Sequence, residues 1–96
     1  MENDERNMKM NIKVKEYVYL VLLDEVYDGD TGDCTVFVYD SREKAEKQLA
    51  ELYKIGKDTN RFDKDESVEG DYVDLYLDGY YNNDHYHARI EKREVE

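Results

Sequence analysis

Residues 12–23, IKVKEYVYLVLL, limit the possible folds of this chain most strongly, because they become apolar on two opposite faces. The stretch alternates at first, which is the period of a β-strand. One side carries Val18, Leu20 and Leu22, and the other side carries Tyr17, Tyr19, Val21 and Leu23. A strand that is apolar on both faces is typical of the middle of a covered sheet. The pattern therefore predicts a central strand.

A hairpin and a helix are predicted next along the chain. The second strand, CTVFVY at 34–39, follows a loop that contains Asp28-Gly29 and Gly32, residues that tolerate tight hairpin turns. Residues 40–57 then change to a helical period, with an apolar stripe of Ala45, Leu49, Leu52 and Tyr53. Asp40 or Ser41 is expected to cap this helix, and Gly56 is expected to end it.

Two more strands are predicted in the C-terminal half, after a polar connection at 57–70 that Phe62 and Val68 anchor. From Tyr72 the chain alternates, with Val73, Leu75 and Leu77 on one face and Tyr72, Asp74 and Tyr76 on the other. Residues 85–95 return with Tyr86, Ala88 and Ile90 in register. The prediction is an α+β fold of order ββαββ: a four-stranded, mainly antiparallel sheet with one helix on one face. Residues 12–96 form its single domain, and residues 1–11 form a disordered N-terminal tail.

The junction TVFVYDSREKAEKQLAEL, with VYLVLLDEVYDGD before it, resembles short acidic proteins of phages and bacteria that share a "VF.S.EKAE" strand-to-helix motif. The similarity covers mainly residues 17–52. It implies an α+β fold and a phage origin, and it assigns no catalytic residue.

Composition restricts the class of partner. The chain has 96 residues, which is enough for one small domain. Its formal charge of −11 repels nucleic acid and anionic membranes. The partners that this charge attracts are basic proteins or cations. The single Cys34 excludes an internal disulfide, and no apolar run has the length of a membrane span. We therefore expect the protein to be located in the cytoplasm of a bacterial host cell.

Metal binding was considered at two places. Asp28, Asp30 and Asp33 depart from a calcium-loop motif in three positions, which leaves either a loose calcium site or an ordinary solvated hairpin. His85 and His87 share one face of a strand, where Cys34 or Asp84 could add zinc ligands, although no zinc spacing is present. The sequence therefore predicts no cofactor and no metal ligand, and because no enzyme motif is present it predicts no catalytic residue.

Net negative charge is concentrated in two blocks, residues 24–40 with −6 and residues 58–84 with −7. Because the helix runs back toward the hairpin, we expect both blocks at one end of the molecule. The candidate partner-binding acids are Asp28, Asp30, Asp33, Asp63, Asp65 and Glu66. The alternative is that these acids serve only solubility.

The ten tyrosines suggest a second binding surface. One helix covers only one sheet face, and we expect Tyr17, Tyr19, Tyr39 and Tyr76 on the other face as a partner surface, including that of a homodimer. The predicted function is a small acidic interaction protein that blocks the basic, nucleic-acid-binding site of another protein. Its phage resemblance suggests an inhibitor of a host defence nuclease. The alternative function is a divalent-cation-binding or purely structural domain.

Overall fold

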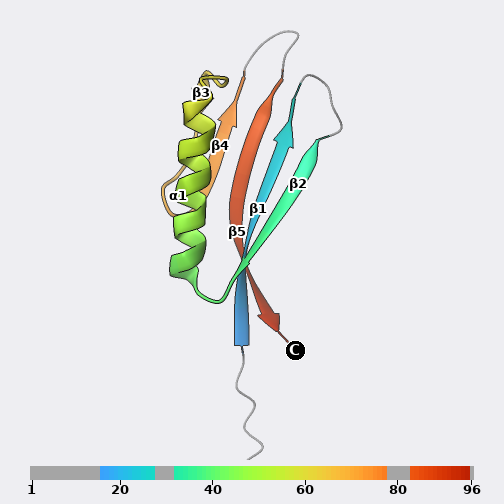
Figure 1. Cartoon of the computed structure of the whole chain (residues 1–96), viewed down its shortest axis with the longest axis vertical. Coiled ribbons are helices and arrows are strands. Elements are labelled where there is room, and N and C mark those ends of the chain that lie inside the picture. Colours follow the sequence, from blue (N-terminus) through green and yellow to red (C-terminus); the bar gives the residue numbers. More distant parts are fainter. Residues whose placement is uncertain (1–15, 28–31, 78–82, 96) are drawn as a thin grey trace, which may run out of the picture.

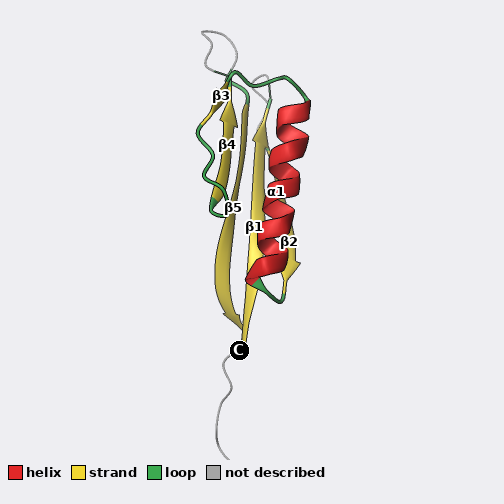
Figure 2. Ribbon diagram, turned by 90° about the vertical axis from the view of Figure 1, so that its left-hand side faces the viewer, coloured by secondary structure: helices red, strands yellow, loops and turns green. Residues whose placement is uncertain are grey.

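The protein, seen in a computed structural model that describes residues 16–27, 32–77 and 83–95, has an α+β fold. Its elements are β1 (Glu16–Val26), β2 (Asp33–Tyr39), α1 (Arg42–Asp58), β3 (Lys64–Asp65), β4 (Tyr72–Tyr76) and β5 (His85–Val95). The strands form one antiparallel sheet in the order β2-β1-β5-β4-β3, and α1 lies along one side of it (Figures 1 and 2). The predicted tail at residues 1–11 lies outside the described residues.

The strand β1 is central, as predicted, because it pairs with β2 on one side and with β5 on the other. The predicted count of four strands was wrong by one, since β3 forms within the stretch expected to be a polar connection. Lys64 pairs with Tyr76 and Asp65 with Leu75, and the backbone N–H of Glu66 donates to Asp74 O at 2.8 Å. A two-residue strand carries no alternation to read, so only the neighbouring strand reveals it.

The helix α1 begins at the predicted place and ends later than predicted. Ser41 is the N-cap, and its Oγ accepts from the Lys44 backbone N–H at 3.3 Å. Gly56 does not end the helix, which continues to Asp58, because this glycine is buried against the sheet. A Cβ added at Gly56 would lie 2.6 Å from Leu75 Cδ1 and 2.9 Å from Tyr86 Cε1. The glycine therefore permits close helix–sheet packing.

The core lies between α1 and the sheet face that carries the odd-numbered residues of β1. Its members are Val21, Leu23, Ala45, Leu49, Leu52, Val73, Leu75, Tyr86 and Ala88. The stripe predicted for the helix and the alternation predicted for β4 and β5 are confirmed by this set. Phe62 also packs against the core, as predicted, whereas the side chain of Val68 is 46% exposed and anchors nothing there.

The predicted tyrosine face was wrong for three of its four members. Tyr19 and Tyr39 lie on the side of α1 and pack against the core, and Tyr17 shares the alternation of Tyr19. Only Tyr76 lies on the face opposite α1, beside His85. The physical reason is register: β1 aligns Leu23 with Ala88 of β5, which brings its odd-numbered side chains to the covered face.

No helix within the described ranges has the length and apolar character that crossing a lipid bilayer requires.

Candidate functional site

The end of β1, the start of β2, the end of α1 and the β3–β4 pair lie at one end of the molecule (Figure 1), and the sequence places many acidic residues in these segments. We call this region the acidic end. Its described carboxylates are Asp24, Glu25, Asp33, Asp58, Asp63, Asp65, Glu66 and Asp84, and its described cations are Lys57, Arg61 and Lys64. The antiparallel topology explains the gathering, because the helix returns the chain to the side of the sheet where the hairpin lies.

Three tyrosine hydroxyls each hold one carboxylate of the acidic end. Tyr27 donates to Glu25 at 2.7 Å, Tyr53 donates to Asp65 at 2.7 Å, and Tyr76 donates to Glu66 at 2.8 Å. A neutral hydroxyl orients a carboxylate without cancelling its charge, whereas a lysine or arginine would cancel it. The Tyr27–Glu25 and Tyr76–Glu66 pairs therefore fix negative charges without cancelling them, whereas Asp65 also contacts the Lys57 ammonium at 3.3 Å, which offsets part of its charge.

The phenols are well suited to remain donors. Burial, together with the hydrogen bond to Glu25, raises the pKa of Tyr27 above its ordinary value. The hydrogen bond to Asp65 raises the pKa of Tyr53 in the same direction. A phenol with a raised pKa keeps its proton at neutral pH, so both hydroxyls stay donors there.

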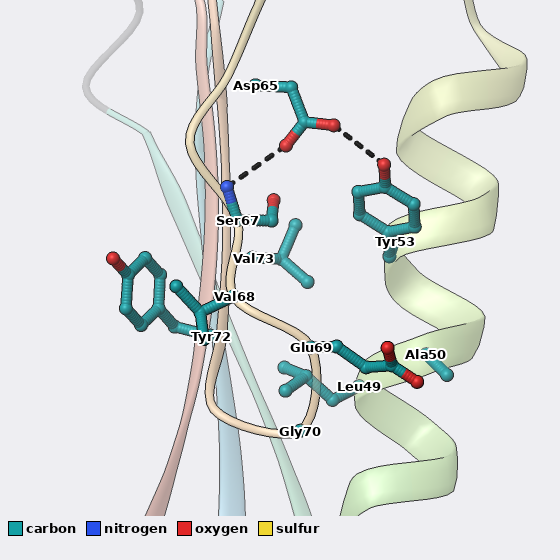
Figure 3. A pocket seen from close by; sticks show the side chains of 10 residues that line it. All are labelled: Leu49, Ala50, Tyr53, Asp65, Ser67, Val68, Glu69, Gly70, Tyr72 and Val73. Carbon is teal, nitrogen blue, oxygen red and sulfur yellow. Dashed lines mark hydrogen bonds between the residues drawn. The ribbon is translucent and has the colours of Figure 1, made fainter.

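Asp65 is the most firmly held of these acids (Figure 3). Besides the Tyr53 hydroxyl, it accepts the backbone N–H of Ser67 at 3.0 Å and the Lys57 ammonium at 3.3 Å. Burial acts to raise the pKa of Asp65, but the hydrogen bonds from Tyr53, Ser67 and Lys57 prevail and hold it well below its ordinary value. Asp65 therefore stabilises the fold through these hydrogen bonds, and it also contributes a negative charge to the acidic end.

Two further acids of this end are paired with arginine. Asp84 is 3% exposed, and its Oδ2 accepts from Arg61 Nε at 2.6 Å. The same guanidinium lies 4.4 Å from the centre of the Tyr27 ring. Asp24 lies 3.4 Å from Arg89. We assign Asp24 and Asp84 to the stability of this end rather than to partner binding.

The remaining predicted site residues are dispersed. Asp33 and Asp63 are exposed at the acidic end, whereas Asp28 and Asp30 lie outside the described residues. Tyr17 lies near the opposite end under the Lys92 ammonium, at 4.1 Å, and the Tyr39 hydroxyl donates to Gln48. The structure thus groups Asp33, Asp63, Asp65, Glu66 and Tyr76, and it separates Tyr17, Tyr19 and Tyr39 from them.

Sequence reasoning missed Tyr27 and Tyr53 as site residues. Tyr27 follows Glu25 by two positions at the end of a strand, and residues so spaced project from the same face. That spacing is a signal that could have found the pair. Tyr53 was assigned only to the apolar stripe of the helix, and its partner Asp65 is twelve residues away, so no local pattern links them.

A cleft of about 450 Å³ separates α1 from the segment 65–73 (Figure 3). Leu49, Ala50 and Val73 form apolar walls, and the carboxylates of Asp65 and Glu69 add negative charge. Arg42 Nη2 donates to Gly70 O at 3.1 Å and so ties the turn of this segment to the start of the helix. The cleft can accept an apolar or cationic side chain.

The two predicted histidines do share a face, with ring centroids 5.9 Å apart. His85 Nε2 lies 2.7 Å from Asp74 Oδ1, and Asp84 is engaged with Arg61 instead. Cys34 lies across the sheet on β2. Within the described ranges, no group of three or more metal-binding side chains is arranged to hold an ion.

Comparisons with protein families, with curated proteins and with solved structures found no match to this chain. Any assignment of function therefore depends on the geometry above.

Proposed function

We propose that the protein is a small acidic interaction protein that uses its acidic end to bind and block a basic site on another protein. The observation that supports this most directly is the set of tyrosine–carboxylate pairs, Tyr27–Glu25, Tyr53–Asp65 and Tyr76–Glu66. Carboxylates that serve only solubility need no fixed orientation. These three are oriented before any partner arrives.

Orientation matters because immobilising a free side chain on binding costs roughly 0.5–1.5 kcal/mol. Carboxylates that are already held incur less of that cost. Their field also attracts a basic partner during diffusion, which raises the association rate when ionic strength is low. A groove that binds nucleic acid is the class of basic site that spaced, fixed negative charges match best, because it is built to contact phosphates. The resemblance to phage proteins makes a host defence nuclease the partner to examine first.

A charge-removal experiment tests the location of the binding surface. The probe is a synthetic peptide of about nine arginines, and its association with the full chain is measured at about 50 and 200 mM salt. In one variant Asp33 and Asp63 become Asn and Glu66 becomes Gln. The matched control replaces Glu43, Glu46 and Glu51 on α1 by Gln, which removes the same charge elsewhere.

We expect the first variant to bind the peptide several-fold more slowly than the wild type at low salt, because charges at the rim act mainly on encounter. The control should lose far less. Equal losses in both variants would show that only net charge matters and would refute a binding surface at the acidic end.

Orientation is tested separately with Tyr76→Phe, which removes the hydroxyl donor of Glu66 and leaves every charge in place. We expect weaker binding of the same peptide, mainly through faster dissociation. The control is Tyr17→Phe, which removes a hydroxyl far from the acidic end. Wild-type affinity in the Tyr76 variant would contradict the role given to the tyrosine pairs.

A further inference from the structure

The sheet face opposite α1, which we call the open face, carries an aliphatic patch on the edge strand β2 and on its neighbour β1. The patch consists of Val18, Leu20, Leu22, Val36 and Val38. Leu22 lies beside Val36 and Leu20 beside Val38 in the β1–β2 register. The side chains of Val36 and Val38 are 51% and 60% exposed, so the patch faces outward. Small monomeric proteins seldom leave contiguous aliphatic surface in water.

The part of the open face on β1, β2 and β5 is nearly neutral, although the chain as a whole carries −11 and Asp74 of β4 adds a carboxylate to this face. On β2, β1 and β5 its charged residues are Glu16, Asp24, Glu91, Arg89 and Arg93. Arg89 contacts Asp24 at 3.4 Å and Glu91 at 3.2 Å, and Arg93 contacts Glu91 at 2.6 Å. Asp24, Glu91, Arg89 and Arg93 are thus paired with one another within the face. Two acidic chains can therefore approach each other here with the least repulsion.

The edge of this face lacks the usual protection against association. β2 is an edge strand, and residues 34–39 contain no charge, no proline and no glycine. Edge strands that remain single are commonly protected by lysine, proline or a bulge. The opposite edge strand, β3, is two residues long and carries Lys64 and Asp65. The apolar surface and the unprotected edge thus coincide on β2.

The area of the open face is that of a weak, reversible contact. Each residue on one sheet face occupies about 30 Å² of flat area, from a strand spacing of about 4.8 Å and a rise of about 3.3 Å per residue. β1, β2 and β5 contribute fifteen residues to the open face, hence roughly 450 Å² before side-chain relief is added. Two such faces would bury roughly 900 Å² of flat area, which is below the about 1,600 Å² of a standard interface and typical of a weak, concentration-dependent one.

From these observations we infer that a second copy of this chain packs on the open face, with the aliphatic patches of the two copies in contact across a two-fold axis. Such an interface is self-complementary, since the same patch serves both copies. Two sheets would face each other about 10 Å apart, as in a β-sandwich. The aliphatic patch itself contains no carboxylate of the acidic end, whereas Asp24 and Tyr76 lie on the open face beyond the patch.

Sedimentation of the full chain from about 1 to about 200 µM tests the inference, because weak interfaces dissociate in the micromolar range. We expect the mass to rise to twice the 11.5 kDa of one chain, and to do so more readily at higher salt, where repulsion is screened. Val36→Arg/Val38→Arg should remain at the mass of one chain. The matched control is Ile55→Arg on α1. Ile55 is 49% exposed in the wild type, and the variant should still dimerise.

A single-chain mass for the wild type throughout this range would overturn the inference, as would a dimer that survives Val36→Arg/Val38→Arg. If that variant fails to fold, Val36→Thr/Val38→Thr keeps the shape and the strand preference while removing apolar contact. The wild type alone offers another measurement: Cys34 lies on the open face and is exposed, so its alkylation should slow as chain concentration rises. A rate independent of concentration would exclude coverage of this face.

Discussion

At the scale of single residues, the tyrosines have two different roles. Tyr86 is buried, and its hydroxyl donates to Leu52 O at 2.8 Å, which joins the sheet to the helix. Burial raises the pKa of Tyr86 to about 12. Tyr27, Tyr53 and Tyr76 instead hold carboxylates at the acidic end. The number of tyrosines in the sequence suggested an interface. The hydrogen-bond partners of these four hydroxyls instead assign them to joining the sheet to the helix or to orienting a carboxylate.

Asp65 provides the prediction at this scale, through the variant Asp65→Asn. The pKa of Asp65 lies below its unfolded value, so its stabilisation is complete above about pH 4 and is lost as pH falls toward the folded pKa. We expect the variant to lose about 1 kcal/mol of unfolding free energy at neutral pH, after allowance for partial exposure. That loss should shrink steadily as pH falls below about 4, and it should disappear only below the folded pKa of Asp65. Urea denaturation at several pH values measures both quantities.

The control for this prediction is Asp71→Asn, an exposed acid of the same segment whose side chain should matter by less than about 0.5 kcal/mol. The contacts of Asp65 with Tyr53 and Lys57 assign a stability cost to the loss of this carboxylate. A loss at Asp65 that did not vary with pH would contradict the ion-linked explanation.

At the scale of elements, the contact of α1 with β4 and β5 depends on the glycine in the last turns of the helix. Gly56 is buried, and its nearest neighbours are Leu75 of β4 and Tyr86 of β5. A helical glycine normally lowers stability by about 1 kcal/mol relative to alanine. Here the missing methyl group is what allows the two layers to touch.

We therefore predict that Gly56→Ala destabilises the fold by about 1 kcal/mol, since overpacking costs about 1–3 kcal/mol and exceeds the gain in helix propensity. The control is Ala50→Gly at an exposed helix position, which measures propensity alone. Leu75→Val removes the closest methyl group and should cost less in the Gly56→Ala background than in the wild type. Thermal or chemical unfolding of the wild type and of these four variants measures the differences. A stabilised Gly56→Ala variant would contradict the packing argument.

At the scale of the whole molecule, charge is unevenly distributed. The acidic end carries more carboxylates than cations, while the open face balances Arg89 and Arg93 against nearby acids. Like charges near one another oppose folding, and dissolved salt screens that repulsion beyond about 8 Å at physiological ionic strength. The uneven distribution should therefore be visible in the response of stability to salt.

We predict that the thermal midpoint rises by a few degrees, about 2–5 °C, between low salt and about 0.2 M sodium chloride. The variant with Asp33→Asn, Asp63→Asn and Glu66→Gln should show a smaller rise, because repulsion at the acidic end is already reduced. The helix control with Glu43, Glu46 and Glu51 replaced by Gln should keep the wild-type rise, since Glu46 pairs with Arg42 at 2.9 Å. Calorimetry at fixed protein concentration measures the midpoint. Identical salt responses in all three proteins would refute repulsion at the acidic end.

The sequence by itself determined the types of element and the side chains that alternate within them. The period-2 alternation of Val73 and Leu75, and of Tyr86 and Ala88, identified the core faces of β4 and β5, and the helical spacing of Ala45, Leu49 and Leu52 identified the stripe of α1. Ser41 was recognisable as a cap because its hydroxyl suits that position. These features were readable because they depend on neighbours within a few residues.

Only the tertiary structure decided which face of β1 is covered. Both faces of β1 are apolar, and shifting its pairing with β5 by one residue would exchange them. The pairing of Leu23 with Ala88 joins positions 65 residues apart, and no local period encodes it. No local period encodes β3, the contact of Gly56 with Leu75 or the pairing of Tyr53 with Asp65 either. Each depends on segments that meet in space only after the sheet has formed.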